Sequence, residues 1–462
     1  MTAAADEPEA SAFAPESGGG SAVDQLFALL LSEQRWDYDL DAVRELQLAA
    51  MSERLEERRT TIAALDQRAD QVGLDTVETL EDASNLLFTG ATYKTYPEAF
   101  VTKRQWPKLL RWLDRLATPD LSHVDVEDSA DLDEFIARLT AAGFPVLTTS
   151  GTSGKCSLLP ATDLDMARCA ENAVVSFGWA HKLDRAAPMP GFFLAKSAGP
   201  YRGTATHITI SQTFVRPGAA YWLYDEPELV EELNRSSQLA RRIAEGSATP
   251  SELSEARHRQ QRAAEHTERR LDYILDELTA IGDEPVLVWG TVYPNWLLVD
   301  RAAAHKIDYR PNVGSRVHIG GGTKSNAMPA TFMDDLHSFW AGVHVSPGCY
   351  GQGEVISVAP QCDAGRYHLP PTTMVIPLTA SGEYVVEPDG HVLQGLLGVF
   401  DIAQDGRWGG LLTSDWLTID LAQCPCGLRS PAVTDCTRLD ARPVTDDKIS
   451  CAGRAEMYVR GV

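Results

Sequence analysis

Apolar residues in the first third of the chain recur at the spacing of helices. Leucine, valine and methionine return at mixed three- and four-residue intervals after Ala22, and a second apolar stripe includes Leu109 and Leu113. This spacing places apolar side chains on one face of a helix, and it predicts a helical region over residues 21–140. The preceding residues, 1–20, are small, acidic and rich in glycine, which predicts a disordered tail.

After residue 140 the pattern changes to short runs of β-branched and apolar residues, which are typical of strands. The runs lie at residues 144–149, 191–194, 207–210, 220–223, 286–289, 316–319, 343–346, 355–358 and 384–387. Strands that alternate with helical stretches predict an α/β protein. A long charged insertion at about 226–282 is predicted to be helical. Its arginines alternate with glutamates, which favours a solvated helical face over a phosphate-binding surface.

The composition is that of a folded globular protein, with 44% hydrophobic and 23% charged residues among 462. The net charge is −24. This acid excess argues against nucleic-acid and anionic-membrane partners, because both attract clustered basic side chains. An anionic ligand would have to be held locally, by backbone N–H groups, a few cations or a metal ion.

The N-terminus lacks the pattern of a secretory signal, since its first 20 residues include four acidic residues, no basic residue and no apolar core. The apolar run at residues 26–31 is too short to span a bilayer. Eight cysteines are too few for a disulfide scaffold in a chain of this length. We therefore expect reduced thiols and a cytoplasmic location.

The most informative segment is the loop T-T-S-G-T-S-G-K, which follows the apolar run at Val146. It combines hydroxyl groups, a lysine charge and two glycines that let backbone N–H groups approach an anion. The donors are Thr149, Ser150, Gly151, Thr152, Ser153, Gly154 and Lys155. The spacing G-x2-G-K excludes a Walker loop, which needs G-x4-G-K. A phosphate cradle and a flexible polar turn both fit, and the density of hydroxyl groups favours the cradle.

A second group of residues has the chemistry of a metal site. It consists of Cys362, His368, Cys424 and Cys426. Three thiols and one imidazole make a closed tetrahedral set for Zn²⁺, with no open position for catalysis. Reduced cysteines in turns fit the same spacing, so the residues alone leave both interpretations open. Cys436 and Cys451 are alternatives for one ligand.

The T-S-G-T-S-G-K loop resembles the phosphate loop of the adenylate-forming superfamily, which comprises acyl-CoA synthetases, adenylation domains and luciferases. The later segment G-G-G-T-K occupies the place of the family's adenine-binding glycine loop and supplies Gly321, Gly322 and Lys324. The C-P-C-G segment with its upstream Cys and His is similar to a set in the phenylacetate-CoA ligase-like branch, which this sequence resembles more than the classical acyl-CoA synthetases. That resemblance implies Zn²⁺ at the four ligands.

Two further segments carry roles that the resemblance implies for the nucleotide. Y-G-Q-G-E resembles the family's Y-G-x-T-E, in which the tyrosine packs on adenine, the threonine touches phosphate and the glutamate holds Mg²⁺. Tyr350, Gly351 and Glu354 match this pattern, whereas Gly353 replaces the threonine. The L-T-S-D segment resembles the family's T-G-D, which implies that Asp415 bonds the ribose hydroxyls.

The C-terminal segment departs from the family. Residues 453–462 resemble only a remnant of the hinge, where Arg454 is assigned to nucleotide binding. We expect the family's small C-terminal domain to be absent, and with it the lysine that neutralises the substrate carboxylate and the α-phosphate. Lys155, Lys324 and Lys448 are candidates to replace that lysine; otherwise a partner supplies it, or its role is lost.

The pocket for the acid is harder to predict. The segment S-A-G-P-Y-R-G-T around Arg202, together with His207, occupies the place of the family's pocket wall. Trp289, Tyr293 and Trp296 are candidates for an aromatic floor, although such clusters belong more often to a core. Arg202 would either pair with a substrate carboxylate or lie at the surface.

The resemblance implies ATP-dependent activation of a small carboxylic acid as acyl-adenylate, with release of pyrophosphate and Mg²⁺ as cofactor. An aromatic or natural-product acid is expected, with a carrier protein, thiol or amine as acceptor. Two alternatives stay open: activation of an oxyanion such as nitrite to diazotise an arylamine, and a degenerate nucleotide-binding protein without catalysis. A homodimer is left open as well.

The implied fold is the family's large N-terminal domain over residues 141–452. It comprises sheets sandwiched by helices and a small β-barrel-like part, and here it follows a helical N-terminal extension.

Overall fold

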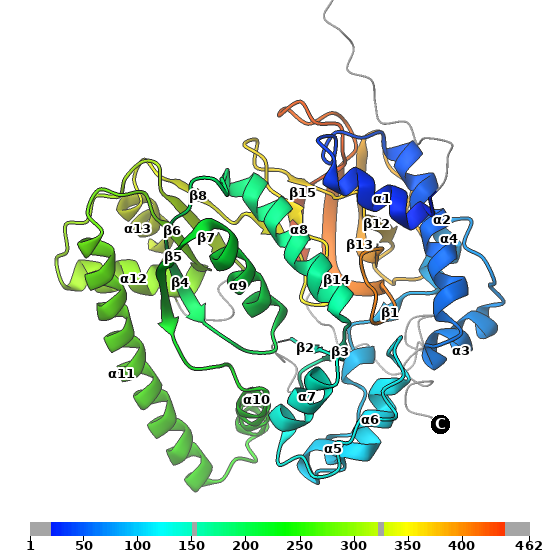
Figure 1. Ribbon diagram of the computed structural model, residues 1–462, viewed down its shortest axis with the longest axis horizontal. Coiled ribbons are helices and arrows are strands. Elements are labelled where there is room, and N and C mark those ends of the chain that lie inside the picture. Colours follow the sequence, from blue (N-terminus) through cyan, green and yellow to red (C-terminus); the bar gives the residue numbers. More distant parts are fainter. Residues whose placement is uncertain (1–19, 150–154, 322–327, 439–462) are drawn as a thin grey trace, which may run out of the picture.

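The computed structural model describes residues 20–149, 155–321 and 328–438. Helices of the N-terminal region and an antiparallel sheet lie on one side of the molecule, and a parallel sheet with its own helices lies on the other (Figure 1). The N-terminal helices are α1 (Ala22–Leu31), α2 (Leu40–Arg58), α3 (Ala63–Val72), α4 (Leu80–Asn85), η1 (Thr92–Lys94), α5 (Glu98–Thr102), α6 (Trp106–Asp114) and α7 (Leu132–Ala141). The prediction of an α/β protein is confirmed.

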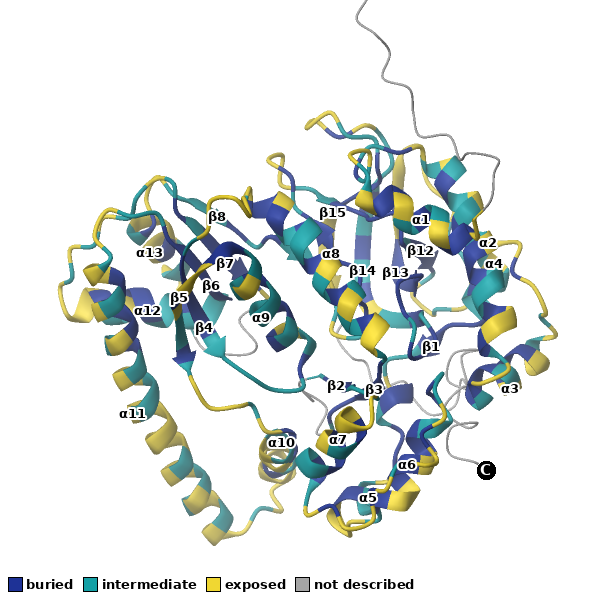
Figure 2. Cartoon of the chain, viewed as in Figure 1, coloured by how far each residue is buried: buried dark blue, intermediate teal, exposed yellow. Residues whose placement is uncertain are grey.

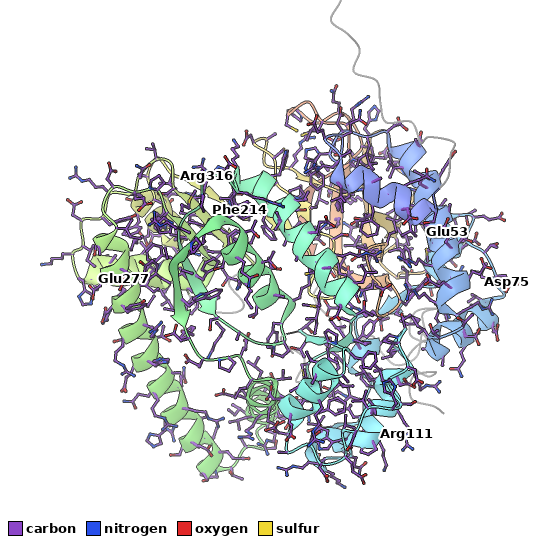
Figure 3. All side chains as sticks on the ribbon, in the orientation of Figure 1. Glu53, Asp75, Arg111, Phe214, Glu277 and Arg316 are labelled. Atoms are coloured by element: carbon purple, nitrogen blue, oxygen red, sulfur yellow. The ribbon has the colours of Figure 1, made fainter. Side chains whose placement is uncertain are left out.

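The first two helices are joined at the start of α1. Ser21 caps this helix, because its side chain accepts a hydrogen bond from the Asp24 N–H at 3.1 Å. Glu53 is labelled on α2 in Figure 3. Its carboxylate accepts from the N–H groups of Ala22 and Val23 at 2.8 and 3.3 Å. A negative charge at the positive end of a helix dipole stabilises the helix, so α2 fixes both the position and the start of α1.

The antiparallel sheet has the order β11-β15-β14-β13-β12, with β1 added in parallel to β14. Its strands are β1 (Phe88–Thr89), β11 (Tyr367–His368), β12 (Thr373–Leu378), β13 (Val392–Asp401), β14 (Gly410–Asp420) and β15 (Ala432–Arg438). The register pairs Met374 with Phe400 across β12 and β13, and Leu417 with Cys436 across β14 and β15. Apolar residues of this sheet and of the N-terminal helices share one hydrophobic core.

Helix α2 covers β12, the outer strand of this sheet. The Arg44 guanidinium donates to the Val375 carbonyl at 2.9 Å. The Gln47 amide donates to the carbonyls of Pro371 and Thr373 at 2.9 and 3.1 Å. An outer strand leaves carbonyl groups without a strand partner, and here side chains of α2 supply the missing donors.

The second sheet is wholly parallel, in the order β5-β4-β6-β7-β8. Its strands are β4 (Met189–Lys196), β5 (Val215–Tyr224), β6 (Leu287–Thr291), β7 (Arg316–Gly320) and β8 (His344–Ser346). Helices α8 (Asp163–His181) and α9 (Arg202–Phe214) pack on one face, and α11 (Pro250–Ala280), α12 (Val292–Ala304) and α13 (Phe332–Phe339) belong to the layer on the other. Helix α10 (Val230–Ala244) packs against α7 instead.

Successive side chains along the central strands pack alternately against the helices on one face of the sheet and those on the other. Phe192 packs in the core that includes Leu275 of α11, whereas Phe193 and Trp289 pack with Phe214 of α9. Side chains along a strand alternate between the two faces of the sheet. A strand covered by helices on both sides must therefore be apolar at every position, which explains its continuous apolar run.

Two short antiparallel strand pairs lie outside the two larger sheets. They are β2 (Val146–Thr148) with β3 (Leu158–Pro160), and β9 (Cys349–Tyr350) with β10 (Ala359–Pro360). Three of the predicted strands are absent from the described structure: residues 207–210 lie inside α9, and residues 355–358 and 384–387 lie outside its strands. The run at 207–210 is rich in β-branched residues, but Thr206, Ile210 and Phe214 recur every four residues and are buried on one face of α9.

The charged insertion contains α10 and α11. Of the 31 residues of α11, the buried ones are confined to its last third, at Leu271, Ile274, Leu275 and Leu278 (Figure 2). The remainder carries the predicted alternation of arginine and glutamate at its surface. None of the helices within the described ranges is both long and apolar enough to cross a membrane.

A buried pair of histidines joins α8 to the parallel sheet. His181 Nε2 lies 3.1 Å from His318 Nδ1, and the His318 ring stacks on Trp289 with centroids 4.1 Å apart. A Cβ at Gly348 would lie 2.5 Å from His181 Nε2, so only glycine fits there. Burial, and then the neighbouring His344 and Arg316, lower the pKa of His181 to about 3, and burial lowers the pKa of His318 well below its usual value.

We expect these histidines to make the fold sensitive to mild acid. Between pH 6.5 and pH 3 the unfolded chain binds a proton at His181 that the folded chain excludes, so stability falls as the pH decreases. For one such group the loss is about 1.4 kcal/mol at pH 5.5 relative to neutral pH. Urea unfolding at pH 7.5 and 5.5 measures it. His181→Gln is expected to flatten the pH dependence and the exposed His258→Gln to leave it unchanged; equal slopes in all three proteins would contradict this.

Candidate functional site

Segments from both halves of the molecule converge between the two sheets. The Thr148 N–H at the end of β2 donates to the Pro200 carbonyl, just after β4, at 2.8 Å. Gly321 follows β7 with φ +69°, a conformation that favours glycine. Open parallel sheets bind ligands at the carboxyl ends of their strands, and β4 and β7 end here.

The side chains of Tyr350, Gln352 and Asp415 form a polar triad at this place. The Tyr350 hydroxyl donates to Asp415 Oδ2 at 2.9 Å, and the Gln352 amide donates to the same oxygen at 3.0 Å. Burial, and then the Asp415 charge, raise the pKa of Tyr350, so its hydroxyl stays protonated and acts as a donor. Tyr350 lies on β9 and Asp415 on β14, so the triad links the hairpin to the antiparallel sheet.

Two arginines, the half-buried Arg202 and the buried Arg407, hold the loop that carries Glu354. The Arg202 guanidinium donates to the carbonyls of Gln352 and Ile356, and Arg407 donates to the Glu354 carbonyl at 2.7 Å. Arg202 therefore supports the loop and is half-buried rather than fully exposed, and a contact with a substrate carboxylate stays a prediction.

Asp401 is a third support of this loop, and no sequence motif predicts it. Its carboxylate accepts hydrogen bonds from the N–H groups of Ile356, Ser357 and Ala403 at 2.5, 3.2 and 3.1 Å, and from the Ser357 hydroxyl at 2.8 Å. Asp401 is almost wholly buried. Nothing in its sequence neighbourhood marks it, because its partners in the loop, Ile356 and Ser357, lie more than 40 residues away.

A steric contact explains why Gly353 replaces the threonine of the family's Y-G-x-T-E motif. A Cβ at Gly353 would lie 2.9 Å from Thr149 Cγ2, closer than real Cβ contacts allow. Thr149 is held in turn by Ser157, since their hydroxyl oxygens are 3.0 Å apart. The start of the predicted phosphate loop thus touches the predicted metal-binding segment, and a threonine side chain in place of Gly353 would collide with it.

We expect Gly353→Thr to destabilise the protein by about 1–3 kcal/mol, the usual cost of overpacking. Thr149→Ser removes the methyl group that would collide and keeps the hydroxyl that bonds Ser157. The double variant is therefore expected to recover most of the lost stability. Urea unfolding of the two single variants and the double variant tests this coupling, and additive effects would show that the contact is unimportant.

The remaining predicted nucleotide residues are placed as follows. Lys155 donates to the Tyr96 carbonyl at 2.5 Å, and its ammonium lies 4.6 Å from the centre of the Tyr96 ring. Gly351 neighbours Val358, with 2.5 Å between its hypothetical Cβ and a methyl carbon. The residues Ser150, Gly151, Thr152, Ser153, Gly154, Gly322, Lys324, Lys448, Cys451 and Arg454 lie outside the described residues.

The prediction that Trp289 contributes to an aromatic floor of the acid pocket is wrong. Its ring is buried in the core beside α8, in contact with Phe177, His181 and His318, because position 289 on β6 points to that helical layer. Tyr293 and Trp296 form a tilted pair on α12 with centroids 6.1 Å apart. His207, on α9, is partly buried.

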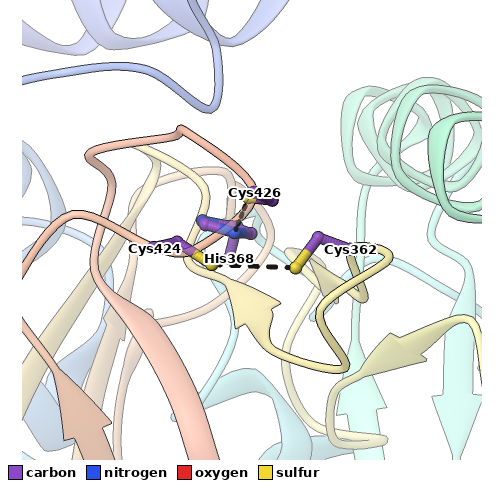
Figure 4. A group of neighbouring side chains, drawn as sticks. All are labelled: Cys362, His368, Cys424 and Cys426. Atoms are coloured by element: carbon purple, nitrogen blue, oxygen red, sulfur yellow. Dashed lines mark hydrogen bonds between the residues drawn. The ribbon is translucent and has the colours of Figure 1, made fainter.

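The four predicted metal ligands come together (Figure 4). Their ligand atoms all lie within 4.8 Å of one another. The sulfur atoms of Cys362 and Cys424 are 3.8 Å apart, and Cys426 Sγ lies 3.3 Å from His368 Nε2. Burial lowers the pKa of His368 to about 4, which leaves its imidazole neutral at pH 7. Cys436 lies on β15, exposed and outside this group.

No family model and no curated protein matches this sequence. Among solved structures, 2-hydroxyisobutyryl-CoA ligase in the postadenylation state with R3-HIB-AMP matches with a TM-score of 0.52 and 11% identity, over 86% of this chain and 68% of that one. O-succinylbenzoate-CoA synthetase from Bacillus subtilis with AMP matches with a TM-score of 0.35 and 13% identity, over 63% and 49% of the chains. Similarity at this identity shows the fold alone: the chain has the fold of the N-terminal domain of adenylate-forming ligases.

Proposed function

We propose that this protein binds ATP with Mg²⁺ and activates a small carboxylic acid as an acyl-adenylate. The triad of Tyr350, Gln352 and Asp415 is the observation that carries the proposal, because it unites two segments with separate nucleotide roles in one site. The 2-hydroxyisobutyryl-CoA ligase of the same fold was solved with an acyl-adenylate, R3-HIB-AMP, which supports this assignment.

The residues present suit the parts of a nucleotide. The Tyr350 ring would pack on adenine, and the Asp415 carboxylate would accept hydrogen bonds from the ribose. Residues 149–155 would bind the phosphates, with Gly321 and Gly322 beside the base and Arg454 at the hinge. In this site the Gln352 amide orients Asp415, so the carboxylate is held in place before the nucleotide binds.

The partly exposed carboxylate of Glu354 fits Mg²⁺, which prefers hard oxygen ligands. When bound, Mg²⁺ neutralises charge on the phosphates. Hydrogen bonds to the backbone of the loop hold Glu354 in position; they come from Arg202, Arg407 and Asp401.

The proposed reaction is an in-line displacement at the α-phosphorus. An oxygen of the substrate carboxylate forms a bond to this phosphorus, and the bond to the bridging oxygen breaks as pyrophosphate leaves. The chain's part is to hold the reactants and stabilise charge, with no covalent intermediate on the protein. An aromatic or natural-product acid, and a thiol, amine or carrier-protein acceptor, remain part of the proposal.

ATP–pyrophosphate exchange across a panel of aromatic and aliphatic acids tests this function. Exchange that depends on one acid is the expected result. Nitrite supplied with an arylamine forms a separate arm, in which AMP release would point to oxyanion activation instead. Binding of ATP by calorimetry without exchange or AMP release in any arm would overturn the proposal in favour of a non-catalytic nucleotide-binding protein.

We also propose a structural Zn²⁺ at Cys362, His368, Cys424 and Cys426. Three sulfur ligands and one nitrogen make a closed set that suits Zn²⁺ and leaves no position for substrate. The close approach of these four ligand atoms supports the assignment. Metal analysis of the purified protein, with one Zn²⁺ per chain as the expected stoichiometry, tests it.

A further inference from the structure

We propose that the Cys362–His368–Cys424–Cys426 centre is a metal-dependent clasp, with Ser430 as the residue that orients its histidine. With metal bound, the clasp ties the hairpin that carries Tyr350 and the N-terminal turn at residues 36–38 to the antiparallel sheet. The inference rests on the Zn²⁺ assignment above and is independent of the nucleotide assignment.

The first element that the clasp holds is the β9–β10 hairpin. Tyr350 on β9 pairs with Ala359 on β10, and the Gln361 N–H donates to the Gly348 carbonyl at 2.7 Å. Cys362 follows directly, and its N–H donates to the Arg366 carbonyl at 2.9 Å. The ligand Cys362 is therefore an extension of the hairpin that positions Tyr350.

The other three ligands belong to the antiparallel sheet. Cys424 and Cys426 lie in the turn between β14 and β15, where the Cys424 N–H donates to the Leu428 carbonyl at 2.8 Å. His368 lies on β11 and pairs with Ala432 on β15. A metal shared with Cys362 would thus join the hairpin to the strands, in addition to the ion pair between Arg366 and Asp420 on β14 at 2.5 Å.

Ser430 orients the histidine ligand. Its hydroxyl donates to the Trp36 carbonyl at 2.6 Å, so its oxygen accepts from His368 Nδ1, which lies 2.9 Å away. The proton of His368 is then on Nδ1, and the lone pair of Nε2 faces Cys426 Sγ. A hydrogen bond of this kind fixes the tautomer and the ring direction of a metal-binding histidine. Ser430 is fully buried, as such a role requires.

Residues next to the metal ligands also hold the N-terminal turn at residues 36–38. Arg429, next to Ser430, forms two hydrogen bonds from its guanidinium to Asp37 at 2.8 and 2.9 Å. The Tyr38 hydroxyl donates to the carbonyl of Leu369, which follows the ligand His368, at 2.8 Å. The residues that bond to the turn at 36–38 thus lie only one to four positions from a metal ligand in the sequence. Loosening the segments that carry the ligands would therefore release the turn.

Hydrogen exchange of the full chain, without nucleotide, tests the clasp with Zn²⁺ bound and after chelation. We expect chelation to speed exchange at residues 36–38 and 349–362 by about tenfold or more, because these segments lose their shared attachment. Added Zn²⁺ is expected to restore the slow exchange, and circular dichroism checks that the helices persist. Unchanged exchange in metal-free protein would overturn the proposal.

Variants separate the role of Ser430 from simple packing. Ser430→Ala is expected to weaken Zn²⁺ binding by about 10- to 100-fold, measured by competition with a chromogenic chelator. Arg429→Gln is expected to speed exchange at residues 36–38 while leaving Zn²⁺ affinity unchanged, and Cys436→Ser to change neither. Wild-type Zn²⁺ affinity in Ser430→Ala would refute the positioning role. Because none of these readouts uses ATP, a failed exchange assay with acids does not affect the outcome.

Discussion

Glu354→Gln is expected to lower ATP–pyrophosphate exchange at least about 100-fold, or about 2.7 kcal/mol of transition-state stabilisation, without changing the melting temperature. The amide keeps the shape of the side chain but loses the charge proposed to hold Mg²⁺. We expect the stability of the fold to be unchanged, because Arg407 bonds to the backbone carbonyl of Glu354 and not to its side chain. Initial exchange rates over a range of Mg²⁺ concentrations measure the effect.

The matched control is Glu383→Gln, which removes one carboxylate from an exposed position outside the site. It is expected to leave exchange and stability as they are. If Glu354→Gln retains exchange close to that of the unmodified protein, the carboxylate does not hold the metal, and the role assigned to this segment is wrong.

Asp401→Ala is expected to cost at least about 3 kcal/mol of unfolding free energy. The substitution leaves three buried backbone N–H groups without their acceptor, while the Ser357 hydroxyl keeps Thr372 as a partner. Each unsatisfied buried group costs about 1–3 kcal/mol. Urea unfolding measures the loss. Asp401→Asn keeps one acceptor oxygen and should cost less. The free energy of unfolding should therefore increase from Asp401→Ala to Asp401→Asn to the unmodified protein.

Asp435→Ala provides the comparison on the same sheet, because this aspartate is exposed and its removal is expected to change stability by no more than about 0.5 kcal/mol. Folded Asp401→Asn protein offers a second readout. Its exchange activity should be reduced, because the loop that carries Glu354 loses part of its support. A stable Asp401→Ala protein would contradict the view that this carboxylate organises the loop.

Local patterns in the sequence were sufficient for much of the fold. The strands at residues 191–194 and 286–289 were predictable because helices cover both faces, so every position is apolar. The run at 207–210 was misassigned because β-branched residues outweighed the four-residue spacing of its buried positions. Propensity is a weak guide where a helix packs firmly on a sheet.

The site shows the same division. Tyr350, Asp415 and the four metal ligands stand in recognisable motifs, and the structure places each group at one location. Asp401 and Ser430 belong to no motif, since their roles come from partners far along the chain. Such roles depend on which backbone groups the fold leaves without partners, and local sequence does not encode that.

The cover that α2 provides for β12 has a consequence for the order of folding. Arg44 and Gln47 bond to residues that are made more than 320 positions later in the chain. During synthesis the side of α2 that covers β12 therefore lacks its partner strand until most of the protein has been translated. Contacts of such long range slow folding and favour aggregation of incomplete chains. Nascent chains that end before residue 371 should consequently depend on chaperones in a way that the finished protein does not.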